Sequence, residues 1–167
     1  MSGRILVSAC LLGQPVRYDG GAKTLQNELL DQWQAEGRVV PLCPEVSAGF
    51  PTPRAPAEIA PGTSGADVWR GAGQIREDTG RDVTETFRRG AQIAVAHARK
   101  AGCRFALLID GSPSCGSTFI YSGMFDGQKR VGQGVVAAAL REDGVQVFAP
   151  SDIEALAQAL TGETRNA

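Results

Sequence analysis

The stretch Arg4-Ile5-Leu6-Val7-Ser8-Ala9-Cys10-Leu11-Leu12-Gly13 lies near the start of the sequence and determines how the rest is interpreted. Its first half is a short aliphatic run bounded by small residues, which predicts a buried strand from Arg4 to Ser8. Cys10 lies two residues after that strand. The chain therefore begins with a core strand that carries a cysteine at its C-terminal end.

Similar strands recur along the chain and alternate with helical patterns. Apolar residues at helical spacing predict helices between them, with glycines such as Gly37 and Gly102 as stop signals. This alternation is typical of βαβ units. It predicts an α/β fold, a single-domain three-layer sandwich with a mostly parallel sheet, spanning residues 1–167 with a core from about 4 to 160. The further strands are expected at 39–42, 104–109 and 145–148, and the helices at 24–36, 82–101, 132–141 and 151–160.

The segment from Ser47 to Gly65 differs from these elements because it is dense in glycine and proline. Proline removes a backbone donor and fixes φ, so a long loop without regular structure is expected here. Loops of this length within a compact domain are usually functional or disordered, and the aromatic and charged residues in this one favour a function. After it, residues 67–70 and 74–77 are expected to pair as a small hairpin.

The composition favours a small-molecule partner. The formal net charge of the 167 residues is -1, which provides no basic patch for a nucleic-acid backbone or an anionic membrane. No stretch approaches the roughly 18 apolar residues of a membrane span. We therefore expect a cytoplasmic protein with no membrane association and no direct nucleic-acid contact.

Three of the four cysteines follow predicted strands. Cys10, Cys43 and Cys115 each lie just past the C-terminal end of a strand, and in a parallel sheet these ends share one edge. Cys103 precedes its strand and is expected at the opposite edge as a small buried residue. Disulfides are rare in the reducing cytosol, so the three thiols are predicted to converge on a metal centre.

The type of metal centre is indicated by the other possible ligands near the three cysteines. Catalytic zinc keeps three protein ligands but usually includes histidine or a carboxylate. The single histidine, His97, lies within a predicted helix, far from any strand end. Three thiolates without histidine favour a four-iron, four-sulfur cluster with one iron left open to substrate.

Six short motifs resemble those of the bacterial thiouracil desulfidase family, in the same order and across nearly the whole chain. The resemblance implies a cluster-dependent, non-redox enzyme that removes sulfur from a thiolated pyrimidine such as 2-thiouracil, giving uracil and sulfide. It also implies that Cys10, Cys43 and Cys115 hold a 4Fe-4S cluster with one open iron. One departure is Ile109, where family members often have lysine. The motifs are residues 7–13, 17–20, 43–45, 51–54, 112–116 and 132–135.

Further site residues are expected around the cluster. Glu45, two residues after a cysteine, is predicted as the general base that activates water. Ser112 or Ser114 is predicted to relay a proton or to hydrogen-bond the cluster, with turn formation as the alternative role. The weaker candidates for substrate contact are Tyr18, Asp19 and Arg54.

The residues leave two other functions open. A non-catalytic iron-sulfur or zinc protein that senses metal or redox state would need the three cysteines but not Glu45 or the serines. A thiol enzyme with Cys115 as nucleophile would need a nearby histidine base, which this sequence does not offer there. The desulfidase hypothesis also leaves room for a thiol acceptor of the sulfur.

Overall fold

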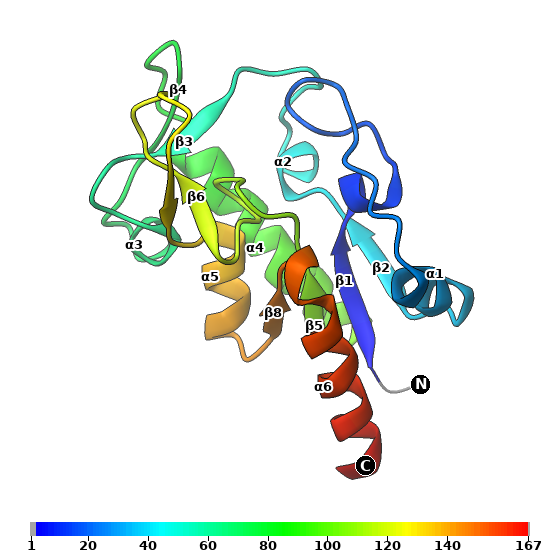
Figure 1. The fold of residues 1–167 in the computed structure, drawn as a ribbon. Helices are drawn as coiled ribbons and strands as arrows, with labels where there is room; N and C mark the ends of the chain where they lie inside the picture. Colours follow the sequence, from blue (N-terminus) through cyan, green and yellow to red (C-terminus); the bar gives the residue numbers. More distant parts are fainter. Residues whose placement is uncertain (1–2, 167) are drawn as a thin grey trace.

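Four parallel strands form one sheet in the order β2-β1-β5-β8 in the computed structural model, which describes residues 3–166 (Figure 1). Ile5 on β1 lies opposite Val39 of β2 on one side and Phe105 of β5 on the other. The predicted parallel α/β sheet is therefore confirmed. The bounds are β1 (Arg4–Ser8), β2 (Val39–Leu42), β5 (Cys103–Leu107) and β8 (Gln146–Phe148).

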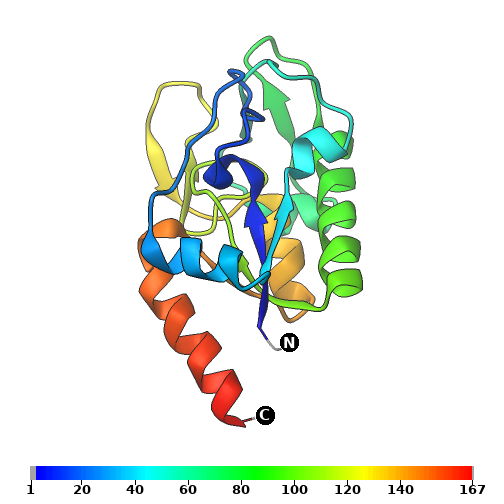
Figure 2. The same ribbon diagram turned by 90° about the vertical axis from the view of Figure 1, so that its right-hand side faces the viewer.

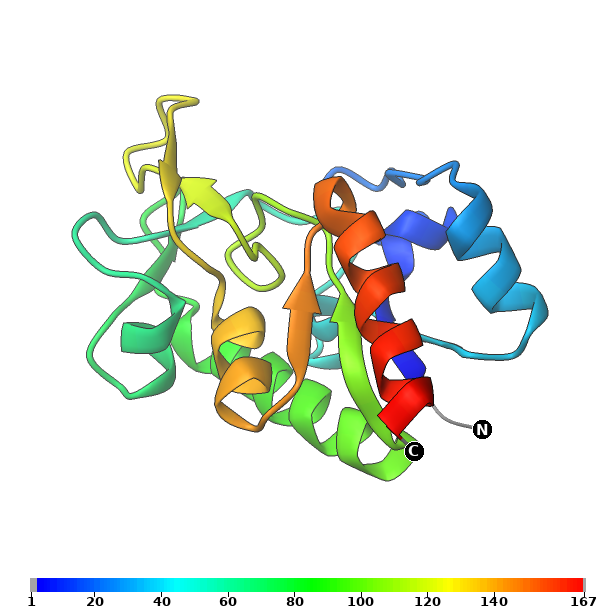
Figure 3. The same cartoon turned by 60° about the horizontal axis from the view of Figure 1, so that its bottom comes forward.

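Helices cover both faces of the sheet and complete three layers, as Figures 2 and 3 show. Successive strand residues point to opposite faces, so Ile5 and Val7 pack with one pair of helices while Leu6 packs with the other. One face carries α1 (Glu28–Ala35) and α6 (Ile153–Asn166). The other carries α4 (Thr84–Ala101) and α5 (Val135–Glu142).

The helices begin later than the sequence predicted. The side chain of Asn27 accepts the N–H of Leu29 at 2.9 Å, which starts α1 four residues after Thr24. The N–H of Thr84 donates to the Asp82 carboxylate at 2.9 Å, and α4 starts there. Similarly, α5 starts at Val135, and α6 follows a 3-10 turn, η2 (Pro150–Asp152). Local capping contacts, rather than hydrophobic periodicity, set the starts of α1 and α4.

The predicted hairpin between residues 67–70 and 74–77 is wrong. A capping box between Ser64 and Asp67 starts a short helix instead, α3 (Gly65–Trp69). The segment β4 (Ile75–Glu77) pairs antiparallel with β3 (Ala57–Ile59), which lies inside the stretch expected to be a loop. Pro56 directly precedes this strand, a position that costs no ladder hydrogen bond.

A second hairpin was not predicted. Strands β6 (Phe119–Tyr121) and β7 (Lys129–Val131) pair antiparallel and project from the sheet beside β3 and β4 (Figure 1). Short helical turns follow the first two strands of the main sheet, η1 (Ala9–Leu12) after β1 and α2 (Pro44–Ser47) after β2. In the part of the chain from 3 to 166, no helix has the length and apolar character needed to cross a bilayer.

The strand order creates a switch point between β1 and β5. The chain runs from β1 to β2 on one side, then returns through α4 to β5 and β8 on the other side. The loops that follow β1 and β5 therefore diverge and leave a crevice at the carboxyl ends of the strands. Ligands of open α/β sheets bind in such crevices.

Candidate functional site

A cavity of about 560 Å³ lies at the carboxyl ends of β1, β2 and β5. Cys10, Cys43 and Cys115 all line it, so the structure brings together the three cysteines that the sequence singled out. Cys103 lies at the other end of β5, where it pairs with Arg4, and is buried. It belongs to the strand itself rather than preceding it.

Cys10 and Cys43 are held by the first turns after their strands. Cys10 lies in η1, and its carbonyl accepts the N–H of Lys23 at 3.0 Å, which ties the following loop to this turn. Cys43 precedes Pro44 at the start of α2 and is the N-cap of that helix. Its sulfur lies 3.9 Å from the carbonyl oxygen of Val16, which belongs to the loop that follows η1.

Cys115 is held by a compact loop. The N–H groups of Ser114 and Cys115 both donate to Ser112 Oγ, at 3.0 and 3.2 Å. At the start of α5, Val135 donates to the carbonyl of Pro113 and Val136 to that of Ser114, both at 2.9 Å. The first N–H groups of α5 thus bind the cysteine loop, which fixes the position of Cys115 relative to the sheet.

Gly134 permits this close contact between helix and loop. A Cβ atom at Gly134 would lie 2.3 Å from the carbonyl oxygen of Ser114, well inside contact distance. Gly134→Ala is therefore expected to displace the cysteine loop and to lower the free energy of unfolding by roughly 1 to 3 kcal/mol, measured by urea denaturation.

Gly162→Ala is the matched control for that substitution. Gly162 lies in α6, and among the described side chains and the backbone outside its own helical turn, no atom lies within 4 Å of the place that a Cβ would take. Alanine is the better helix former by roughly 1 kcal/mol, so this variant is expected to be as stable as the wild type or more stable. Equal stability of Gly134→Ala and the wild type would contradict the packing argument.

Asp110 fixes the other end of the same loop. Its Oδ1 accepts the N–H groups of Ser117, Thr118 and Phe119 at 3.0, 3.1 and 3.1 Å. Burial raises the pKa of this carboxyl, but the hydrogen bonds from Thr118 and from the three backbone N–H groups outweigh it and lower the pKa below its usual range. The loop therefore folds around a charged carboxylate.

Glu45 lies in the first turn of α2, and its side chain contacts the cysteine loop. The hydroxyl of Ser114 donates to Glu45 Oε2 at 2.7 Å, and Ser112 Oγ lies 2.7 Å from Ser114 Oγ and 3.3 Å from the same carboxylate oxygen. Glu45 and Ser112 line the cavity, whereas Ser114 is buried behind them. The three predicted catalytic residues thus form one hydrogen-bonded group beside Cys115.

Arg54 holds the other oxygen of Glu45. Its Nε donates to Glu45 Oε1 at 3.1 Å, and only 6% of the Arg54 side chain is exposed. The rest of the guanidinium donates to the carbonyls of Val16 and Pro51 and to the hydroxyl of Thr52. Arg54 lines the cavity, but most of its donors are bound within the protein.

The three cavity cysteines are free thiols with raised pKa values. Burial, together with the nearby Cys43, raises the pKa of Cys10 to about 11. Burial is also the main cause that raises the pKa of Cys43 and of Cys115. A buried thiolate needs a compensating cation, so the thiols suit a metal cluster whose iron replaces their protons.

Among residues 3–166, no three His, Cys, Asp or Glu side chains are arranged to hold a single metal ion. The cysteines of an iron-sulfur cluster bind different irons and need not converge on one point. The set of three soft sulfur donors around one cavity fits such a cluster in its chemistry.

The remaining predicted contacts divide into two groups. Tyr18 lines the cavity and is 42% exposed. Ile109, the residue at which this chain departs from the family pattern, also lines the cavity. Asp19 is not among the lining residues; its carboxylate accepts the N–H of Gly21 at 2.9 Å and so shapes the local turn.

Several lining residues were not predicted. They come mainly from β3 and from the β6–β7 hairpin, two elements that the sequence interpretation did not include. The alternation Phe119-Ile120-Tyr121, followed by Gly123 and Gly127, is a hairpin signal that could have found part of this set. The missed residues include Lys23, Glu58, Phe119, Tyr121, Phe125 and Lys129.

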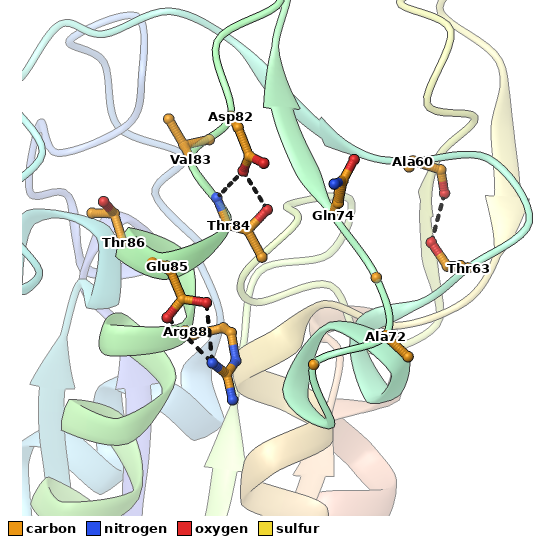
Figure 4. A pocket seen from close by; sticks show the side chains of 12 residues that line it. Ala60, Thr63, Ala72, Gln74, Asp82, Val83, Thr84, Glu85, Thr86 and Arg88 are labelled. Atoms are coloured by element: carbon orange, nitrogen blue, oxygen red, sulfur yellow. Dashed lines mark hydrogen bonds and ion pairs between the residues drawn. The ribbon is translucent and has the colours of Figure 1, made fainter.

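A second cavity, of about 670 Å³, lies at the start of α4 (Figure 4). Arg88 donates to Glu85 at 3.1 Å there, and Asp82 binds Thr84. This cavity contains none of the cysteines or other predicted site residues. Its lining side chains pair Asp82 with Thr84 and Glu85 with Arg88 at a helix terminus, and Arg88 Nε is buried without a hydrogen-bond partner among the residues that the structure describes.

Comparisons with known proteins agree with this geometry. The chain is 42% identical over 149 residues to the uncharacterised protein YbbK of Bacillus subtilis (strain 168), which covers 89% of this chain and 97% of that protein. A solved structure of TudS, described as a [4Fe-4S]-dependent thiouracil desulfidase, is 47% identical, with a TM-score of 0.86 over 96% of this chain and 99% of that one. The family model of 2-thiouracil desulfurase matches residues 5–152. The chain therefore belongs to the 2-thiouracil desulfurase family.

Proposed function

We propose that this protein is a [4Fe-4S]-dependent desulfidase that converts 2-thiouracil and water into uracil and hydrogen sulfide. One observation carries the proposal: three cysteines line a single cavity beside a carboxylate that is hydrogen-bonded to the loop of the third cysteine. Similarity to TudS, described as a [4Fe-4S]-dependent thiouracil desulfidase, and membership of the 2-thiouracil desulfurase family support the choice of substrate.

Cys10, Cys43 and Cys115 are the residues that would hold the cluster. They are the three cysteines on the cavity, and thiolates are the usual ligands of such clusters. When bound through three cysteines, the cluster supplies an iron without a protein ligand, which acts as a Lewis acid toward the substrate sulfur.

Glu45 is the group in this chain that accepts a proton from water. Its carboxylate lines the cavity, and its side chain is 16% exposed, so water reaches it. Removal of a proton makes the water oxygen a better nucleophile for the thiocarbonyl carbon. The reaction exchanges sulfur for oxygen at that carbon and requires no net change of oxidation state.

The two serines connect Glu45 with the cavity, a route by which the proton that Glu45 takes from water returns to a ring nitrogen of the substrate. Ser114 donates to Glu45, and its hydroxyl contacts that of Ser112, which faces the cavity. Because the oxygen of Ser112 already accepts two backbone N–H groups, its own hydrogen is directed to an acceptor. Ser112 lines the cavity and Ser114 does not, so Ser112 is the serine that can reach substrate, and Ser114 links it to Glu45.

Arg54 positions Glu45 rather than binding substrate. Arg54→Gln is expected to lower kcat roughly 10-fold or more, because an unanchored Glu45 loses its orientation, and to leave KM nearly unchanged. Steady-state kinetics with 2-thiouracil measure both quantities. Arg81→Gln, which changes an arginine whose side chain is 72% exposed, is the control and should behave as wild type. A rise in KM alone would instead favour direct substrate contact.

The other parts of the proposal concern partners and location. The substrate is a small thiolated pyrimidine, and its sulfur leaves as hydrogen sulfide, so any sulfur-accepting partner would take up sulfide itself. No membrane or direct nucleic-acid partner is proposed. The four free cysteines suit a reducing compartment, so a cytoplasmic location is proposed.

Anaerobic purification tests the function most directly. We expect a brown protein with about four irons and four sulfides per chain, as a four-iron, four-sulfur cluster requires. Added 2-thiouracil should then yield equal amounts of uracil and sulfide. A colourless protein with stoichiometric zinc would contradict the cluster. A loaded cluster with no turnover of 2-thiouracil would contradict the desulfidase activity and favour a sensor.

A further inference from the structure

Four side chains of the β6–β7 hairpin line the cavity and have no task in the proposed chemistry. We call this set the hairpin wall: Phe119, Tyr121, Phe125 and Lys129. Phe125 and Tyr121 are 38% and 36% exposed, so the wall presents aromatic surface to the cavity and to solvent. Large exposed aromatic residues gathered at a cavity usually mark a binding surface.

The hairpin wall is built against the cysteine loop. The rings of Phe119 and Tyr121 meet edge to face, with their centroids 6.3 Å apart. A Cβ at Gly111 would lie 3.0 Å from the Phe119 ring and 3.4 Å from the Tyr121 ring, so Gly111 lets these rings pack onto the loop. Lys129 Nζ lies 4.6 Å from the centroid of Phe119. The wall is therefore a fixed neighbour of the loop that carries Ser112.

Phe125 occupies a backbone conformation that phenylalanine rarely adopts. Its φ is 55°, in the left-handed region, and it is the one described residue other than glycine with positive φ. Glu58 maintains this conformation, because its Oε1 accepts the N–H groups of Gly123 and Phe125 at 2.8 and 3.3 Å. Glycine or asparagine would suit the backbone better, so the ring at this position has a role other than turn formation.

We propose that the hairpin wall is the subsite that binds the flat ring of the substrate, with Phe125 stacked on a planar heteroaromatic ring. This inference rests on the proposed function for the identity of the ring. Stacking on an aromatic side chain holds a planar ring without consuming its polar edge. The thiocarbonyl edge then stays free to face the cysteines, and Lys129 is placed to donate to an acceptor oxygen of the ring.

Phe125→Gly tests this subsite with little risk to the fold, since glycine adopts positive φ readily. We expect this variant to raise the KM for 2-thiouracil and to weaken binding of uracil roughly 5- to 20-fold, with kcat changed less than KM. Uracil binding is measured by calorimetry on the protein with its cluster bound. Because uracil has the ring but no sulfur, its affinity measures the contact with the ring separately from the desulfuration. Phe125→Tyr, which keeps an aromatic ring, should have the KM and the uracil affinity of the wild type.

Met124→Ala is the matched control, because Met124 lies in the same turn and is 66% exposed but does not line the cavity. It should bind and turn over as wild type does. Wild-type KM and uracil affinity in Phe125→Gly would overturn the subsite while leaving the proposed function intact. If the wild type binds uracil but does not convert 2-thiouracil, weaker binding by Phe125→Gly would support the subsite and the proposed function would fail.

Discussion

Replacing Cys115 with alanine is expected to leave a folded protein that holds no intact four-iron cluster and has no desulfidase activity. Cys115 is 4% exposed and lines the cavity with the other two cysteines, so no neighbouring thiol is available to take its place. The activity loss should exceed the roughly 10- to 100-fold cost of changing a residue that only supports a metal ligand. Iron and sulfide analysis, with absorption spectra, measures the first effect, and uracil production measures the second.

Cys103→Ala is the control that makes this result specific. Cys103 is equally buried, at 5% exposed, but lies at the opposite end of the sheet. It should retain the full iron content and activity. Cys10→Ala and Cys43→Ala should behave like Cys115→Ala. Iron loss in Cys103→Ala with a full cluster in Cys115→Ala would show that the ligands are a different trio.

Glu45→Gln is expected to separate the cluster from the catalysis. The amide has nearly the size of the carboxylate and still accepts a hydrogen bond from Ser114, so the cluster spectrum should match that of the wild type. Glutamine does not take up a proton from water, and the loss of a general base costs roughly 10²- to 10⁴-fold in kcat. Stopped assays of uracil formation measure this loss.

Glu142→Gln, at the exposed end of α5, controls for a change of net charge. Its rate should equal that of the wild type. A wild-type rate in Glu45→Gln would remove Glu45 from the mechanism, and loss of the cluster in that variant would assign it a structural role instead.

Much of the fold could be predicted because the relevant signals are local. The strand from Arg4 to Ser8 has the observed bounds, and a run of aliphatic residues between small ones is sufficient to identify it. The placement of Cys10, Cys43 and Cys115 followed from a general property of parallel sheets, whose carboxyl ends share one edge. Both predictions depend on spacing along the chain alone.

Other features depend on contacts between distant residues. Strand β3 exists because residues 57–59 pair with 75–77, and no periodicity within Ala57–Ile59 indicates that partner. The wrong hairpin has a different origin, because the capping box of Ser64 and Asp67 is a local signal that starts a helix where a turn at Gly71 was expected. Short strands gain their stability from their partner, so their own sequence carries a weak signal.

The sequence by itself determined which cysteines gather, the class of fold and the residue types available for chemistry. Only the tertiary structure decided how they are used: that Arg54 binds Glu45, that Ser114 lies behind Ser112, and that the hairpin wall lines the same cavity as the cysteines. The physical reason is that Glu45 and Ser114 are 69 positions apart in the chain. A hydrogen bond over that separation depends on how the sheet, α2 and α5 pack, and local sequence patterns contain no information about that packing.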